Sequence, residues 1–324
     1  MMINLKLYII IILVIILVII LVNIFIHKYN KPSLVLQLKN TNYDYTFEKY
    51  YINNNKNCYP SSYIFEIFTK NKYNNIYNQT IKIQKYFGVN KTVYGIKKVK
   101  DEYLFEYYYS YYNENKLHNI QNIFKLFKIN NRINFENYCL ISFELINNNI
   151  IELSQNINEI NIYYLLNNCN HKTPILFHNF TICKQCLSCM NKTYNINNNT
   201  IIDKNIYKNF PRNTSNLTEI YNYTKTLIGN DVDLNLIFTP YLLSCKKNIC
   251  VAKKPNSIGF YFSLVPFDDF IIFLEKSNFN EELRYKLIEN NNKLSYLLFD
   301  IGFDIIIKED NNIIFNKLSF YGIL

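Results

Sequence analysis

An apolar run near the start of the chain limits its fold and its location more than any other feature. Residues 7–26 read LYIIIILVIILVIILVNIFI, with a single interruption at Asn23. Twenty helical residues span about 30 Å, the thickness of the hydrocarbon core of a bilayer. Ile, Leu and Val each favour insertion by roughly 0.3–0.6 kcal/mol, so one Asn near the boundary cannot offset their sum. A surface helix would carry a polar face, which this run lacks. We therefore predict a transmembrane helix at residues 7–26.

The residues after this run indicate that it is retained. A secretory signal peptide has a shorter apolar core and small residues at its cleavage site. Residues 22–30 contain no such site, and the only alanine of the chain is Ala252. The sequence thus predicts an uncut signal-anchor at residues 1–32, which contacts membrane lipid through residues 7–26.

Two features give opposite predictions for the orientation of this anchor. Basic residues follow the run at Lys28, Lys31 and Lys39, and the positive-inside rule would keep the following domain in the cytosol. Against this, the chain has eight N-x-[ST] sequons, which have a function only in the secretory lumen. Their asparagines are Asn78, Asn90, Asn179, Asn191, Asn198, Asn213, Asn216 and Asn222.

The distribution of the sequons is more informative than their number. With 54 asparagines and 28 serines and threonines in 324 residues, chance alone would give about five sequons. Six of the eight, however, fall between residues 179 and 224. This clustering favours a glycosylated domain that is lumenal, extracellular or on a virion surface.

Composition indicates a folded domain and argues against nucleic-acid binding. The chain has 30 tyrosines and 24 phenylalanines, whereas disordered chains are poor in aromatic residues. Its net charge of +10 comes from lysine, with only three arginines, and nucleic-acid readout favours arginine. The densest basic stretch, residues 97–100, is followed by Asp101 and Glu102, and we interpret it as the end of an exposed strand.

The same composition resembles that of proteins from A+T-rich genomes. Lys, Asn, Ile, Tyr and Phe dominate, whereas Ala, Gly, Pro and Arg are scarce and Trp is absent. This usage is similar to that of amoebal giant-virus proteins and of apicomplexan parasites, and it extends over the whole chain. It implies no functional residues, and no motif matches a characterised family.

The residue patterns predict an α+β domain with an antiparallel sheet after the anchor. Two hairpins are expected, at 91–112 and 301–321, because β-branched or aromatic runs flank short polar turns. The tripeptide Tyr-Gly-Ile occurs in both, which raises the hypothesis of an internal duplication. The other expected strands are 33–38, 138–145, 160–166 and 258–265, and the expected helices are 61–70, 117–127, 217–227, 266–276 and 280–298.

Three segments differ in character after the anchor. Residues 33–166 form an α+β part, and residues 251–324 form a C-terminal part that completes the sheet. Residues 167–250 hold six of the eight cysteines and six sequons, and we interpret them as an insertion or a small subdomain.

The cysteines of this segment have two interpretations. Cys183 and Cys186 are spaced as a C-x-x-C pair, and with Cys245 and Cys250 they could complete a Cys₄ zinc site. On the lumenal side of a membrane, the cysteines would instead form disulfides. If this segment faces the cytosol, the cysteines are expected to bind zinc, and if it faces the lumen, they are expected to form disulfides. We favour disulfides.

No catalytic constellation is evident in the sequence. Phosphate-binding, nucleophile-elbow and zinc-protease motifs are absent, and the six glycines are too dispersed for a phosphate loop. Asp268 and Asp269 fit the first turn of a helix, and Asp300 and Asp304 at a strand start need no functional role.

We therefore expect a non-enzymatic, membrane-anchored, glycosylated domain that contacts a protein partner or a host surface and needs no cofactor. The alternative is a cytosol-facing, membrane-tethered domain with a structural zinc, which could be part of an enzyme of unknown type.

Overall fold

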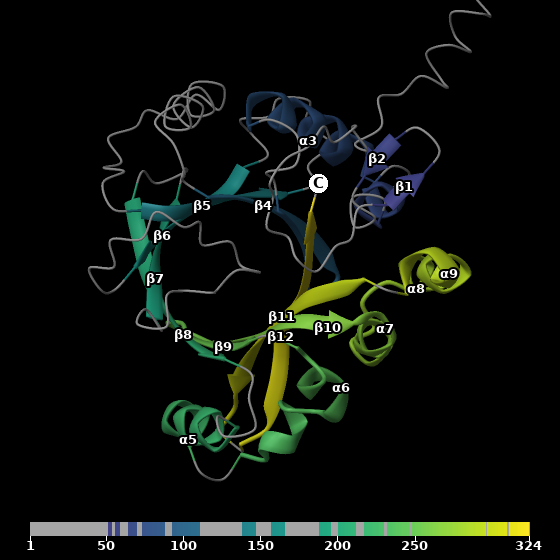
Figure 1. The fold of residues 1–324 in the computed structure, drawn as a ribbon. Helices are drawn as coiled ribbons and strands as arrows, with labels where there is room; N and C mark the ends of the chain where they lie inside the picture. The colour runs from purple at the N-terminus through teal and green to yellow at the C-terminus, as the bar shows by residue number, and fades with distance from the viewer. Residues whose placement is uncertain are drawn as a thin grey trace, which may run out of the picture. The chain divides into compact units, whose positions relative to one another are not determined.

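In the computed structural model, a closed barrel of ten antiparallel strands forms the centre of the described part of the chain (Figure 1). Its strand order is β3-β4-β5-β6-β7-β8-β9-β10-β11-β12, and β12 pairs with β3 to close the ring. The structure describes residues 51–53, 56–58, 64–69, 73–87, 93–110, 138–146, 157–165, 188–195, 200–211, 217–229, 232–246, 248–295, 297–309 and 311–323.

The barrel strands are sequential neighbours, so each pair is a hairpin or a longer antiparallel connection. Both predicted hairpins are confirmed, since β3 pairs with β4 and β11 pairs with β12. The strands are β3 (Val93–Val99), β4 (Glu102–Ser110), β5 (Tyr138–Ile146), β6 (Ile157–Leu165), β7 (Ser188–Asn195), β8 (Thr200–Pro211), β9 (Asn248–Lys253), β10 (Ile258–Pro266), β11 (Leu298–Ile307) and β12 (Ile313–Ile323).

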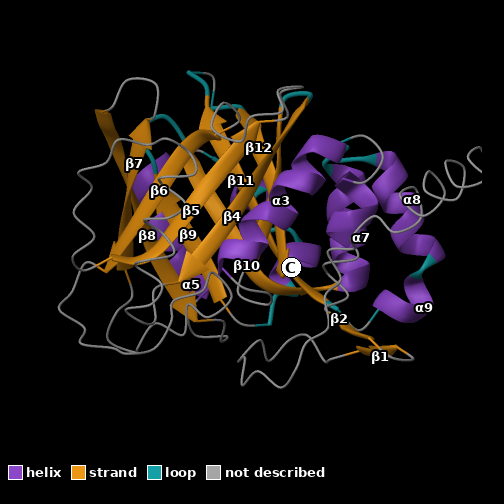
Figure 2. Ribbon diagram, turned by 90° about the horizontal axis from the view of Figure 1, so that it is seen from above, coloured by secondary structure: helices purple, strands orange, loops and turns teal. Residues whose placement is uncertain are grey.

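Helices pack against the outside of this ring (Figures 1 and 2). A separate two-stranded sheet joins β1 (Tyr51–Asn53) to β2 (Lys56–Cys58), and residues 64–69 are helical. The other helices are α3 (Asn74–Phe87), α5 (Leu217–Ile228), the 3-10 turn η4 (Leu234–Leu236), α6 (Pro240–Leu243), α7 (Phe267–Lys276), α8 (Glu281–Glu289) and α9 (Asn291–Leu294).

The predicted class, an antiparallel sheet with several helices, is confirmed. The strand predicted at 138–145 and the helices predicted at 217–227 and 266–276 correspond to β5, α5 and α7. Of the segment 167–250, β7, β8 and β9 pair within the same barrel as the strands on either side. The strand predicted at 33–38 and the helix predicted at 117–127 lie outside the described residues.

One predicted helix is wrong in its extent. Residues 280–298 were expected to form one helix, but α8 ends at Glu289 and a short α9 follows before β11. The chain turns at Asn290, whose φ of −102° and ψ of 17° leave the helical region. Asn290 begins a run of three asparagines, and asparagine is a weak helix former that favours turns.

The transmembrane prediction lies outside the described residues, since residues 7–26 are not among them. Among the residues that are described, no helix has both the length and the apolar character needed to cross a bilayer.

The aromatic core lies between the outer face of the barrel and the helices. Phe65 contacts Tyr94 of β3 with ring centroids 4.8 Å apart. Phe270 of α7 stacks on Phe299 of β11 at 4.0 Å. These rings are buried, so the apolar face of the sheet points outward, towards the helices.

The recurring tripeptide is explained by a reciprocal contact between β3 and β12. Gly95 lies opposite Tyr321, and Tyr94 lies opposite Gly322. A Cβ on Gly95 would lie 2.7 Å from the ring of Tyr321, and one on Gly322 would lie 2.6 Å from the hydroxyl of Tyr94. Each tyrosine thus covers the glycine of the other strand, and this packing accounts for both copies without an internal duplication.

Candidate functional sites

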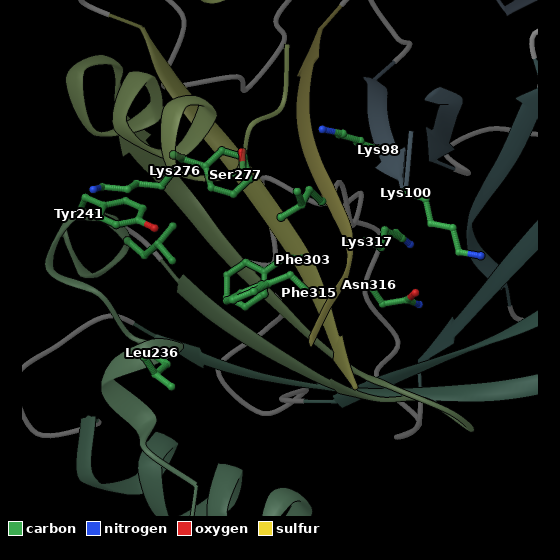
Figure 3. A pocket seen from close by; sticks show the side chains of 13 residues that line it. Lys98, Lys100, Leu236, Tyr241, Lys276, Ser277, Phe303, Phe315, Asn316 and Lys317 are labelled. Carbon is green, nitrogen blue, oxygen red and sulfur yellow. The ribbon is translucent and has the colours of Figure 1, made fainter. Parts of the chain in front are cut away.

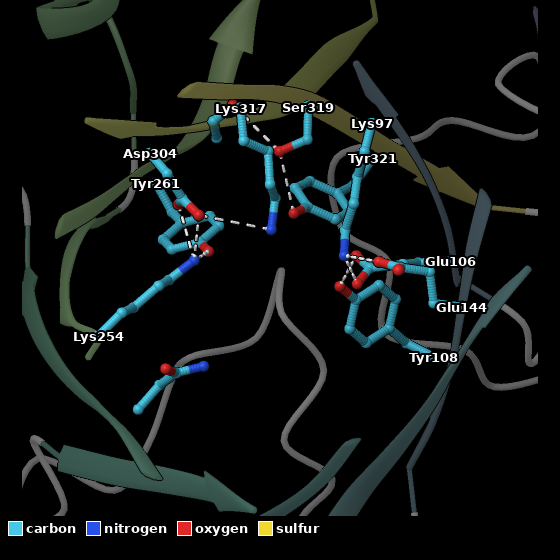
Figure 4. A network of polar contacts seen from close by, with 12 residues as sticks. Lys97, Glu106, Tyr108, Glu144, Lys254, Tyr261, Asp304, Lys317, Ser319 and Tyr321 are labelled. Carbon is cyan, nitrogen blue, oxygen red and sulfur yellow. Dashed lines mark hydrogen bonds and ion pairs between the residues drawn. The ribbon is translucent and has the colours of Figure 1, made fainter. Parts of the chain in front are cut away.

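Six charged side chains meet on the inner face of the barrel (Figure 4). They occupy alternate positions with the outward-facing aromatic residues, as the pleat of a strand requires. Four of them are at most 5% exposed, whereas the side chains of Lys254 and Lys317 are 10% and 18% exposed. The group, which we call the inner charge network, consists of Lys97, Glu106, Glu144, Lys254, Asp304 and Lys317.

In one half of the network, one lysine serves two carboxylates. The ammonium of Lys97 donates to Glu144 at 2.6 Å and also pairs with Glu106. Glu106 and Glu144 lie directly opposite each other on β4 and β5, so without Lys97 two like charges would face each other. The hydroxyl of Tyr108 donates to Glu106.

In the other half, two lysines share one carboxylate. Lys254 donates to both oxygens of Asp304 at 2.7 Å, and the ammonium of Lys317 lies 3.6 Å from the same group. Burial alone would raise the pKa of Asp304, but the two ammonium groups outweigh it and lower this pKa to about 2. Burial, reinforced by Lys317, lowers the pKa of Lys254 to about 8 despite the attraction of Asp304.

This arrangement is electrostatically balanced, because three lysines face three carboxylates. Its members come from β3, β4, β5, β11 and β12 and from Lys254 just after β9, so the ion pairs connect strands that are far apart in the chain. Within the described residues the network therefore cross-links the inside of the barrel, and its charges are already matched.

The sequence predictions for these residues need two corrections. Residues 97–100 were expected to be an exposed strand end, but Lys97 is buried because its position in the pleat faces inward. Asp304 was expected to have no role, but it binds two lysines of the network. A usable signal existed: a single charge stands between apolar neighbours in Phe105-Glu106-Tyr107 and in Phe303-Asp304-Ile305.

Asp300 has a separate structural role at a bulge in β10. The register of β10 against β11 shifts between Phe262 and Val265. Leu264 at this bulge has a φ of 62°, a conformation that costs a non-glycine residue roughly 1–2 kcal/mol. Its backbone N–H donates to the carboxylate of Asp300 at 2.9 Å, which compensates for the interrupted ladder. Asp268 and Asp269 lie in the first turn of α7, as predicted.

Two of the four predicted zinc ligands, Cys245 and Cys250, lie among the described residues. Cys245 and Cys250 are buried thiols that no disulfide joins to each other, and Cys183 and Cys186 lie outside the described residues. Burial raises the pKa of Cys250 to about 12, so this thiol keeps its proton at neutral pH. Across the described residues, no three or more His, Cys, Asp or Glu side chains are grouped as metal ligands. The zinc site stays a prediction.

Two sequon asparagines have described side chains, and both are exposed. Asn78 lies on α3 and Asn222 lies on α5, whereas Asn191 lies on β7. The remaining sequon asparagines are outside the described residues: Asn90, Asn179, Asn198, Asn213 and Asn216.

A groove of about 410 Å³ lies on the outer side of the barrel (Figure 3). Its apolar floor includes Phe273, Phe303 and Phe315, and the rings of Phe303 and Phe315 meet edge to face at 5.2 Å. Its volume is in the range of small-molecule sites. The elements around it are β3, β11, β12, η4, α6 and α7, together with the β3–β4 turn.

Lysines lie around this groove. Figure 3 shows Lys276 on one side of the two rings and Lys98 with Lys100 on the other. No aspartate or glutamate is among the described residues that line it. The groove therefore combines an apolar floor with a positive rim.

Two comparisons at the level of the sequence found no match. No protein-family model matches the chain, and no curated protein matches it.

Proposed function

We propose that this chain is a single-pass membrane protein with an N-glycosylated domain that has an interaction role rather than a catalytic one. Residues 7–26 would form the anchor, and the barrel domain would face the lumen, the extracellular space or a virion surface. A protein partner or a host surface would contact this domain.

The observation that carries the proposal is the position of Asn78 and Asn222. Both are exposed on helices outside the barrel, on faces that point away from the aromatic core. A glycan on either residue would extend into solvent without displacing a buried contact. The inner charge network would be unaffected.

The same helices imply that glycan transfer would precede folding. Thr80 and Thr224, the third residues of these two sequons, are completely buried. The hydroxyl of Thr80 contacts the hydroxyl of Tyr107 on β4 and donates to the carbonyl of Ile76 at 2.7 Å. An enzyme could reach these hydroxyls only before α3 and α5 pack on the barrel.

An interaction role is supported by the way charge is distributed over the barrel. The buried charges of the inner network are matched with one another, which suits a scaffold. A recess that solvent can reach lies on the outer side, and large apolar side chains such as Leu236 and Phe315 are about half exposed there, at 55% and 46%. Exposed apolar groups of this kind are typical of binding surfaces.

The test is expression of the full chain in cells with a secretory pathway, followed by digestion with an N-glycosidase. We expect a lower apparent mass after digestion, and a smaller shift in Asn78→Gln and in Asn222→Gln. Asn292→Gln is the matched control, because Asn292 is exposed but belongs to no sequon. Protease added outside intact microsomes should leave the barrel domain intact. An unchanged mass together with complete digestion would contradict the proposal.

A further inference from the structure

The groove on the outer side of the barrel has the chemistry of a ligand site, independently of the membrane orientation proposed above. It is bounded by helices on one side and by the β3–β4 hairpin on the other.

The floor of the groove is apolar and partly exposed to solvent. Phe303 and Phe273 are buried beneath it, whereas Phe315 and Leu236 remain about half exposed. Covering such side chains releases water, at about 25 cal/mol per Å² of apolar area. An apolar body the size of one or two rings would therefore gain free energy by lying on this floor.

The rim of the groove is positive. Lys100 and Lys276 are exposed, and Figure 3 shows their side chains on opposite sides of the two rings. Lysine has a flexible stem, so each ammonium group can rotate towards a bound anion. The described lining contains no carboxylate that would compete for them.

One end of the groove is fixed before any ligand arrives. Lys98 of β3 donates to the backbone carbonyl of Asn278, just after α7. Tyr103 of β4 donates to the next carbonyl, that of Phe279. These two bonds join the hairpin to the α7–α8 connection, so the groove does not have to form on binding. Preorganisation of this kind reduces the entropic cost of binding.

We propose that this groove binds a small amphipathic organic anion, in which an apolar ring system carries one carboxylate. The ring system lies on the floor formed by Phe303, Phe315 and Leu236. The carboxylate lies at the rim, where the flexible side chain of either Lys100 or Lys276, which stand on opposite sides of the floor, neutralises it. Neither the ring system nor the carboxylate alone is sufficient for binding. Ion pairs with exposed lysines are weak, and the apolar floor is small.

The test uses the intact chain in lipid nanodiscs and isothermal titration calorimetry, with empty nanodiscs as the background. Naphthoate is the probe, and its neutral analogue naphthamide and the ring-free anion acetate are the comparisons. We expect naphthoate to bind at least about tenfold more tightly than either. Equal binding of naphthamide, or an absence of naphthoate binding at millimolar concentration, would overturn the proposal.

Variants distinguish binding in the groove from a general effect of the protein's charge. The double variant Lys100→Gln/Lys276→Gln should weaken naphthoate binding about fivefold, because each exposed ion pair contributes roughly 0.2–1 kcal/mol. The matched control is Lys253→Gln/Lys308→Gln, which removes the same charge at exposed lysines away from the groove lining. Both double variants should retain the thermal unfolding midpoint. If the two weaken binding equally, the proposal fails.

A third variant tests the floor. Phe315→Ser removes a half-exposed ring, so it should cost little stability while weakening naphthoate binding several-fold. Ile314→Ser is its control, since Ile314 is 39% exposed but does not line the groove. Unchanged affinity in Phe315→Ser would also overturn the proposal.

Discussion

The two faces of the barrel are stabilised in different ways. On the outer face, rings such as Phe299 and Phe320 pack against Phe270 of α7, and these ring contacts involve no charged group. On the inner face, Lys97 and the two glutamates opposite it depend on one another. Neighbouring residues of one strand, such as Ile96 and Lys97, belong to these two different environments.

The two faces should therefore respond differently to substitution. The free energy that apolar packing contributes is roughly proportional to the buried area, and such packing tolerates substitutions that conserve volume. A buried ion pair is different, because removal of one partner leaves the other charge desolvated and unmatched. The inner face should therefore be the less tolerant of the two.

The largest expected effect is that of Lys97→Met. This change leaves Glu106 and Glu144 opposite each other without their shared cation, and we expect a loss of about 3–5 kcal/mol in the free energy of unfolding. Urea unfolding of the intact chain at pH 7, followed by circular dichroism, measures it. On the outer face, Phe270→Leu is the comparison, with an expected loss of about 1 kcal/mol.

A triple variant tests whether the stability lost in Lys97→Met is electrostatic in origin. Lys97→Met/Glu106→Gln/Glu144→Gln removes the cation and both anions together, and it should recover much of the lost stability. If this triple variant is as unstable as Lys97→Met, the loss comes from the packing of the lysine stem, and the electrostatic account of the inner face is wrong.

A smaller effect is expected at the two glycines beneath tyrosine rings, one on each face. Gly95→Ala and Gly322→Ala should each cost about 1–3 kcal/mol, since the new Cβ would overlap a buried ring. Tyr321→Leu should relieve most of the cost of Gly95→Ala but none of the cost of Gly322→Ala. Simple additivity in this double-mutant cycle, measured by urea unfolding, would contradict the reciprocal packing of β3 and β12.

The smallest effect expected is a pH dependence of the inner face, at most about 1.4 kcal/mol per pH unit. The pKa of Lys254 is about 8 in the folded chain and ordinarily 10.5. Above pH 8 the unfolded chain therefore binds more protons at this site, so stability should rise with pH towards about 10. Beyond that it should fall, because burial raises the pKa of Tyr321 above its ordinary value of 10.0.

On the acid side of this profile, stability depends on the attraction of Asp304 to two lysines, not on the burial of a lysine. The pKa of Asp304 is lowered to about 2 from 3.8, so its stabilising contribution is complete above pH 4 and is lost as the pH falls towards 2. Urea midpoints between pH 7.5 and 9.5 test the alkaline side. Lys317→Met is the informative variant, since it removes the competing cation and should flatten the rise. A rise that is unaffected by this change would have another origin.

Much of the local structure could be predicted from the sequence, because it follows from short-range patterns. The turn between β3 and β4 and the closing hairpin of β11 and β12 have β-branched or aromatic runs on either side. The helix α7 begins directly after Pro266, as its fixed φ favours. These elements depend on neighbours a few residues apart.

The strand β8 shows where this kind of prediction stops. Its inward positions include Asn209, which is buried, while outward Ile206 is 41% exposed. The usual alternation of apolar buried and polar exposed residues is therefore reversed along part of this strand. A pattern rule assigns such a segment to a loop, and β8 was missed for this reason.

The apolar run at 7–26, the sequon cluster, the antiparallel hairpins and the helix starts can be identified from the amino-acid sequence, since each depends on residues adjacent in the chain. The closure of the strands into a ring, the burial of Lys97 and Asp304, and the groove between α7 and the β3–β4 hairpin became evident only from the fold. These features depend on residues that are far apart in the chain. An ion pair between residues 97 and 144, or between 254 and 304, leaves no local pattern, because it exists only after the ring has closed.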